Sequence, residues 1–177
     1  MQAIASLLDP VTNEQTKDLW RVLEEKCGLA GIKTTPYPHF SWLSCEDLDW
    51  ARVCKKLEKI TSKVSGFRVN TAGIGIFPGA NPILYIPVIK TPELLQIHQL
   101  IWKEVAQYLI KPQDYYLPDQ WMPHITLAHG DLNQDNLACA IRDLALDSRV
   151  YEIFVDNISV IFHIDDKVGV NAVFKLE

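Results

Sequence analysis

The stretch Trp121-Met122-Pro123-His124-Ile125-Thr126-Leu127 is the most informative part of this chain, because a shorter relative of it, Pro38-His39-Phe40-Ser41-Trp42-Leu43, occurs in the first half. Both stretches run proline, histidine, apolar, hydroxyl, apolar. Side chains alternate between the two faces of an extended strand, so the histidine and the hydroxyl share one face and the apolar residues share the other. The pattern therefore predicts two strands that each present an imidazole beside a hydroxyl.

Four polar side chains of these strands are candidates for a catalytic site, namely His39, Ser41, His124 and Thr126. An imidazole exchanges protons near neutral pH and serves as a general acid or base. A hydroxyl can donate a hydrogen bond to a negatively charged oxygen. Two such pairs on two strands indicate acid–base chemistry on an anionic group.

The spacing of the motifs suggests an internal duplication. Their histidines lie at positions 39 and 124 of 177 residues, which places one motif in each half of the chain. Hydrophobic periodicity and turn residues predict the order helix, loop, histidine strand, polar turn, helix and extended strand in both halves. We therefore expect residues 1–177 to form a single α+β domain with two lobes and a cleft between them.

Capping and turn residues locate the elements around the motifs. The sequence predicts helices that begin at Thr12 or Asn13, at Ser44, at Thr91 and at Asn133. It also predicts a hairpin in which the strands 67–77 and 83–89 flank a turn at 78–82.

The composition is that of a water-soluble globular protein, with 48% hydrophobic and 22% charged residues. No stretch approaches the run of about 18 apolar residues that spans a bilayer, and the N-terminal segment lacks the basic region of a secretory signal. We expect a cytoplasmic monomer with no membrane partner. The net charge of -5 opposes binding to extended duplex nucleic acid, which calls for a basic surface, but it is compatible with a nucleotide or an RNA end.

The four cysteines, Cys27, Cys45, Cys54 and Cys139, show neither a Cys-x-x-Cys pair nor the dense spacing of a disulfide-rich protein. We therefore expect reduced, buried thiols.

The other three histidines are weaker candidates for the site. His98 lies at helical spacing among apolar residues, which predicts a packed side chain, and His163 near a strand end has a structural or surface role. His129 comes five residues after His124 and faces away from the site if the strand continues regularly. The chain contains no His-x-x-x-His or His-Glu-x-x-His, so we expect no metal and no cofactor.

Taken with their context, the two motifs resemble the paired H-x-[ST]-x signatures of the two-histidine (2H) phosphoesterases, the superfamily of the 2′-5′ RNA ligase-like and 2′,3′-cyclic nucleotide phosphodiesterase proteins. The order of elements, Gly75-Ile76-Phe77 and Leu84-Tyr85-Ile86 are also similar to that family. The resemblance implies a bilobal duplicated α+β fold, with two antiparallel-sheet lobes, outer helices and both histidines in a central cleft that holds no metal.

The resemblance also implies roles for the motif residues. Of His39 and His124, one acts as the general base and the other as the general acid, while Ser41 and Thr126 bind the phosphate. We expect a metal-independent phosphoesterase that hydrolyses a phosphodiester of a nucleotide or an RNA end, most directly a 2′,3′-cyclic phosphate, with reversible 2′-5′ RNA ligation as a further reaction of the same histidine pair. The alternative is a noncatalytic nucleotide- or RNA-binding module on the same fold.

Two aromatic residues and one basic surface are candidates for contacts with the rest of a substrate. Tyr37 and Trp121 flank the motifs and are positioned to stack on a base, with core packing as the alternative for each. A basic helical face is interpreted as solvated surface rather than an RNA track; it comprises Arg52, Lys55, Lys56, Lys59 and Lys63.

Overall fold

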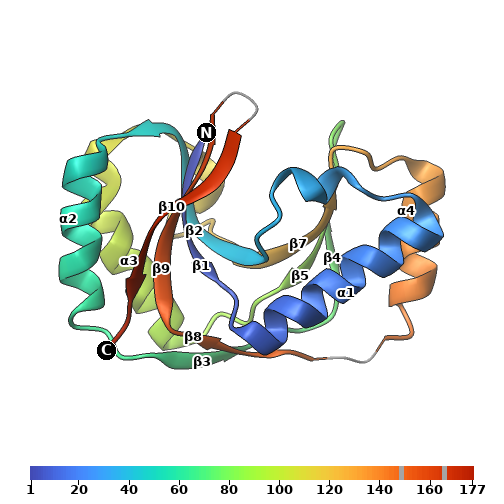
Figure 1. The fold of residues 1–177 in the computed structure, drawn as a ribbon, viewed down its shortest axis with the longest axis horizontal. Helices are drawn as coiled ribbons and strands as arrows, with labels where there is room; N and C mark the ends of the chain where they lie inside the picture. Colours follow the sequence, from blue (N-terminus) through green and yellow to red (C-terminus); the bar gives the residue numbers. More distant parts are fainter. Residues whose placement is uncertain (148–149, 165–166) are drawn as a thin grey trace.

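A long antiparallel sheet runs through the molecule and carries both histidine motifs (Figure 1). The computed structural model describes residues 1–147, 150–164 and 167–177. In spatial order, the strands are β10 (Lys167–Lys175), β9 (Asn157–Ile164), β1 (Gln2–Leu7), β2 (His39–Leu48), β7 (His124–His129), β5 (Ile83–Pro87) and β4 (Gly75–Phe77), and β6 (Leu109–Pro112) pairs with β2. A separate two-stranded ribbon pairs β3 (Phe67–Asn70) with β8 (Glu152–Val155).

The two halves of the long sheet meet where β2 and β7 pair through Phe40 and Ile125, the middle residues of the two motifs. The α+β class with antiparallel sheets and helices is confirmed, and the sheet is continuous across both halves of the chain. Pairing at this point satisfies backbone groups that two separate sheet edges would leave without partners. The junction also brings the two motifs together.

Two helix pairs cover the ends of the sheet (Figure 1). Helix α1 (Pro10–Cys27) packs against α4 (Gln134–Leu144), and α2 (Trp50–Thr61) packs against α3 (Pro92–Val105). Each helix turns an apolar side toward the sheet, as α2 does with Val53, Leu57 and Ile60. Thr91 and Asn133 cap α3 and α4 as predicted.

Two predicted helix starts are wrong. Helix α1 begins directly after Asp9, whose carboxylate caps it, and not at Thr12 or Asn13. Residues 44–47 continue β2 instead of starting a helix, and α2 begins after Asp49. Both β1 and β6 pair with this part of β2, so cross-strand hydrogen bonds override its local preference for a helix start.

The predicted strand 67–77 is two strands in different sheets. β3 pairs with β8, whereas β4 pairs with β5 around the predicted turn at 78–82. Gly73 lies between β3 and β4 with a φ of 63°, a conformation that glycine adopts at little cost.

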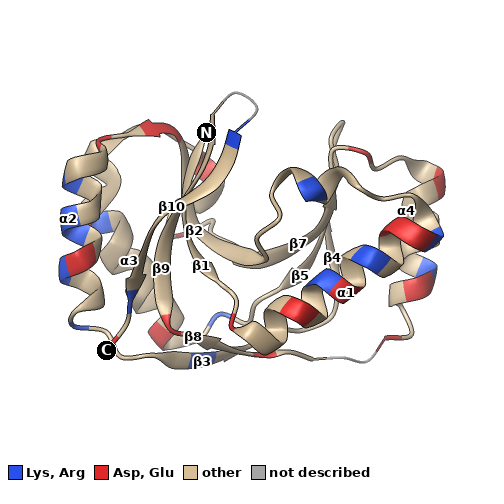
Figure 2. Ribbon diagram, in the orientation of Figure 1, with Lys and Arg blue, Asp and Glu red and all other residues tan. Residues whose placement is uncertain are grey.

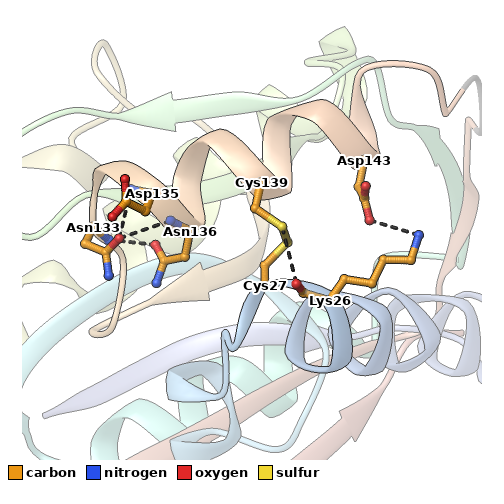
Figure 3. The surroundings of a disulfide bond; sticks show 7 residues. All are labelled: Lys26, Cys27, Asn133, Asp135, Asn136, Cys139 and Asp143. Atoms are coloured by element: carbon orange, nitrogen blue, oxygen red, sulfur yellow. Dashed lines mark hydrogen bonds and ion pairs between the residues drawn. A yellow bond between two sulfur atoms is a disulfide. The ribbon is translucent and has the colours of Figure 1, made fainter.

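A disulfide joins Cys27, at the end of α1, to Cys139 in α4 (Figure 3). The prediction of reduced thiols is wrong for this pair, because 112 residues separate the two cysteines along the chain and only the packing of α1 on α4 brings them together. Lys26 and Asp143 form an ion pair of 2.9 Å across the same two helices. Cys45 and Cys54 are free thiols, and Cys45 is buried.

Many of the charged side chains lie on the helices. Figure 2 shows acids and bases mixed along α1 and α2, whereas the strands β1, β5 and β7 contain none. On the basic side of α2, Lys56 pairs with Glu104 at 2.7 Å and Arg52 with Asp49 at 3.4 Å, which supports its interpretation as solvated surface. Within the described ranges, none of the helices combines the length and the apolar character needed to cross a membrane.

Candidate active site

A cavity of ≈ 500 Å³ lies where β2 and β7 meet. Its walls also include the start of β1, the end of β9 and residues of two short helices, η1 (Gly31–Thr34) and η3 (Asp114–Tyr116). The side chains predicted for catalysis and phosphate binding all line it: His39, Ser41, His124 and Thr126. A volume of this size is in the range of about 300–1,000 Å³ that is typical of sites for small ligands.

Each motif histidine is held by the backbone carbonyl two residues before it. The Nδ1 atom of His39 lies 2.5 Å from the carbonyl oxygen of Tyr37, and Nδ1 of His124 lies 2.7 Å from that of Met122. A carbonyl oxygen only accepts, so Nδ1 carries the proton and donates it. In the neutral ring Nε2 then has the lone pair, and it is the nitrogen that can take a proton from a bound molecule. In both motifs a proline separates the two residues and favours an extended conformation before it, which is a local reason for the shared geometry.

Burial lowers the pKa of both motif histidines. For His39 burial is the main cause, the hydrogen bond to Tyr37 opposes it, and positive charge on His124 and His129 lowers the pKa further. For His124 burial again lowers the pKa and the hydrogen bond to Met122 opposes it. Both rings therefore favour the neutral form at pH 7, and an anion bound between them would favour protonation of one.

The hydroxyl residues are held in a matching way by tryptophan side chains. The indole N–H of Trp121 donates to the carbonyl of Ser41 at 2.9 Å, and that of Trp20 donates to the carbonyl of Thr126 at 3.0 Å. The phenol of Tyr116 lies beside the Ser41 hydroxyl; burial raises the pKa of Tyr116, and its hydrogen bond with Ser41 opposes that rise. These contacts fix the backbone from which both hydroxyls enter the cavity.

Of the two alternatives for Trp121, core packing is observed and stacking on a base is not. Trp121 is 0% exposed, and its ring lies 5.5 Å from that of Trp42 and 3.9 Å from that of His98, measured between centroids. It belongs to the core behind β2. His98 is packed there as predicted, with Nε2 3.0 Å from the carbonyl oxygen of Trp42.

Two aromatic rings that were not predicted for the site lie beside His124. Tyr37 is half-buried and contributes its carbonyl to His39, but it is not among the described residues that line the cavity. The rings of Phe77 and Tyr85 lie 5.0 Å and 5.1 Å from that of His124, so they flank this imidazole and contribute to its burial. Local sequence did not reveal these two residues, because β4 and β5 reach His124 only through sheet pairing.

Both motif strands contain an irregularity directly after the hydroxyl residue. Trp42 is an extra residue in the pairing of β2 with β1, and Leu127 is an extra residue in the pairing of β7 with β5. An extra residue of this kind changes the face that the following side chains occupy. As a result Ser44 and His129, each five residues after a motif histidine, line the cavity.

The prediction that His129 faces away from the site is therefore wrong, since it assumed a regular strand. His163, expected in a structural or surface role, is exposed at the end of β9 and also lines the cavity. Although imidazoles are common metal ligands, no three His, Cys, Asp or Glu side chains in residues 1–147, 150–164 and 167–177 gather as a metal site. The imidazole and hydroxyl groups that line the cavity are suited to proton transfer and hydrogen bonding.

Residues 10–166 match the family model described as the 2′-5′ RNA ligase superfamily. The chain belongs to this superfamily. The resemblance of its two motifs to the two-histidine phosphoesterases is thereby confirmed. A protein of Bacillus cereus strain B4264, named "Putative phosphoesterase", is 25% identical over 156 residues, which are 82% of this chain and 85% of that protein. A Bacillus cytotoxicus protein of the same description is 25% identical over 65% of this chain and 62% of its own length.

Solved structures share the fold over the whole chain. TT0787 of Thermus thermophilus superposes with a TM-score of 0.68 at 15% identity, covering 99% of this chain and 97% of that one. LigT of E. coli, crystallised in complex with 3′-AMP, superposes with a TM-score of 0.56 at 12% identity, covering 99% and 96%. At these identities the likeness shows the fold alone.

Proposed function

We propose that this protein is a metal-independent phosphoesterase that hydrolyses a phosphodiester of a nucleotide or RNA end, with a 2′,3′-cyclic phosphate as its substrate. Membership of the superfamily and the description of its relatives as phosphoesterases support the reaction class. The nucleotide bound to the structurally similar LigT supports the ligand class.

The matched setting of His39 and His124 is the observation that carries the proposal. Both rings line one cavity, and both have Nδ1 engaged by a backbone carbonyl, so each can use Nε2 for proton transfer. A pair of titratable groups in one cavity is what concerted acid and base catalysis requires. The hydroxyls of Ser41 and Thr126 enter from the same two strands.

In the proposed reaction the neutral histidine accepts a proton from water while the water oxygen attacks phosphorus. The protonated histidine gives its proton to the ribose oxygen whose bond to phosphorus breaks. Ser41 and Thr126 donate hydrogen bonds to the non-bridging oxygens, where negative charge increases. With a ribose hydroxyl in place of water, the same two proton transfers would form or cleave a 2′-5′ linkage.

The test is incubation with the four nucleoside 2′,3′-cyclic monophosphates and with a short RNA that ends in a 2′,3′-cyclic phosphate, each with an excess of chelator. We expect the cyclic phosphates to be converted to 2′- or 3′-phosphates, and phosphorus NMR measures this conversion. Binding without conversion of any substrate would support the noncatalytic nucleotide- or RNA-binding module instead. Activity lost with the chelator and restored by one divalent ion would overturn the metal-independent mechanism.

A further inference from the structure

Two imidazoles of the cavity, those of His129 and His163, have no part in the proposed reaction. Charge on His129 lowers the pKa of His39, and charge on His163 lowers the pKa of His129. Both imidazoles line the same cavity as His39 and His124, His129 from the last position of β7 and His163 from β9. The imidazoles thus extend from the junction of β2 and β7 to the end of β9.

The lining of the cavity is suited to anions. Among the described residues that form it there is no carboxylate, lysine or arginine, although the whole chain has a net charge of -5. Apart from the imidazoles, its ionisable groups are the phenol of Tyr116 and the amino group of Met1, which donates to the carbonyl of His163 at 2.8 Å. A cavity that has imidazole and hydroxyl donors and no carboxylate is suited to an anion.

The acid that acts on His129 is held by the backbone through one of its two carboxylate oxygens. The carboxylate of Asp131 accepts the backbone N–H groups of Ala30 and Gly31, both at 2.7 Å. Burial is the main cause that lowers the pKa of His129, while Asp131 opposes this effect and His163 adds to it. The other carboxylate oxygen, Oδ1, is buried and has no hydrogen-bond partner among the described residues, so Asp131 does not hold the His129 ring by a hydrogen bond.

Neutral donors surround the same part of the cavity. Ser44 enters from β2 at the position that corresponds to His129 in β7, and Thr34 and Thr35 enter from the segment of η1. Hydroxyl and imidazole donors together are suited to the several oxygens of a phosphate.

We propose that His129 and His163 form a second anion subsite, which binds the 5′ phosphate of the nucleotide whose 2′,3′ end lies between His39 and His124. This inference rests on the proposed function and extends it to the substrate class. In RNA the 5′ phosphate of the last nucleotide is the phosphodiester that joins it to the rest of the strand. The preferred substrate is then an RNA end, and a nucleoside cyclic monophosphate lacks one of the groups that the cavity recognises.

The kinetic test compares uridine 2′,3′-cyclic monophosphate with the same compound carrying a 5′ phosphate. For the parent we expect kcat/KM to be about tenfold higher with the 5′ phosphate, the value of one charge-assisted hydrogen bond. His129→Gln and His163→Gln should each remove most of this preference, mainly through KM. Lys59→Gln, which removes a positive charge from the exposed side of α2, is the matched control and should keep it.

A third variant makes the test independent of folding defects. His129→Arg places a permanent cation in the subsite, so it should keep the preference for the 5′ phosphate that His129→Gln loses. Two results would overturn the subsite. One is an equal kcat/KM of the parent for both substrates. The other is that kcat/KM falls by the same factor for both substrates in the folded variants His129→Gln and His163→Gln.

A binding experiment separates failure of the subsite from failure of the proposed function. If the parent hydrolyses neither substrate, the proposed function fails, and calorimetric titration with 3′-AMP and adenosine 3′,5′-bisphosphate still decides the subsite. We expect tighter binding of the bisphosphate by the parent, and loss of this difference in His129→Gln and His163→Gln. Equal affinities of the parent for the two nucleotides would overturn the inference.

Discussion

The strand that carries His39 and the strand that carries His124 are built alike. In each, Nδ1 of the histidine donates to the carbonyl two residues earlier, and an indole N–H holds the carbonyl of the hydroxyl residue. Each strand is also irregular directly after that hydroxyl residue. The backbone therefore presents the same set of groups to the cavity twice.

The neighbours of the two histidines differ. His39 is sensitive to charge on the imidazoles of His124 and His129, whereas His124 is flanked by the rings of Phe77 and Tyr85. Charged neighbours and apolar neighbours act differently on the proton affinity of an imidazole. The comparison teaches that a repeated backbone geometry can still give two histidines different neighbours, which is one way in which proteins set an acid apart from a base.

The largest expected effect comes from removing either histidine. His39→Ala and His124→Ala should each lower kcat on the best phosphodiester substrate by about 10²–10⁴-fold, because each removes one of the two proton transfers. The double variant should be little slower than the single ones, since the two groups act as a unit. Thermal melting provides the folding control. A folded single variant with near-parental turnover would contradict the assignment.

The disulfide distinguishes the helix pair beside β7 from the pair beside β2. α1 and α4 are joined by Cys27–Cys139, while α2 and α3 are bridged by the Lys56–Glu104 ion pair. Reduction should lower the free energy of unfolding by about 2–4 kcal/mol, because the open chain gains conformational freedom when unfolded.

Urea unfolding with and without reductant measures this effect. A variant with serine at both Cys27 and Cys139 should show the lower stability and no response to reductant, whereas Cys54→Ser should respond like the parent. An unchanged urea midpoint of the parent in reductant would contradict the prediction.

The hydroxyls should matter less than the imidazoles. Ser41→Ala and Thr126→Ala each remove one hydrogen-bond donor, which is worth about 0.5–1.5 kcal/mol when neutral and more when it meets developing charge. We expect a moderate decrease in kcat, with Thr126→Ser close to the parent. Steady-state kinetics would contradict this if Thr126→Ala were as slow as His124→Ala.

The smallest expected effect is a displacement of the pH profile. The pKa values of His39 and His124 both lie below the ordinary 6.5. The dependence of kcat/KM on pH should therefore be bell-shaped, with a rising limb below pH 6.5. Replacing His129 by Gln removes a positive charge that lowers the pKa of His39, so the limb that belongs to His39 should move to higher pH. The limb that belongs to His124 should stay in place. A profile in which neither limb moves would contradict the electrostatic difference between the two strands.

The sequence by itself determined the two motif strands and the side chains they present. Alternation along a strand is a local property, so it sufficed to pair His39 with Ser41 and His124 with Thr126. Local hydrogen bonds between a side chain and the nearby backbone likewise sufficed for the caps at Thr91 and Asn133. The separation of the motifs indicated one cavity for both, and the superfamily match confirmed the resemblance that they suggested.

Only the tertiary structure decided which other residues reach the cavity and which do not. The irregularities that bring in Ser44 and His129 arise from pairing with β1 and β5, and the burial of Trp121 arises from packing on His98 and Trp42. The disulfide depends on the packing of α1 on α4 in the same way. Each of these features is set by contacts between segments far apart in the chain, whose free energy exceeds the local preferences that sequence patterns report.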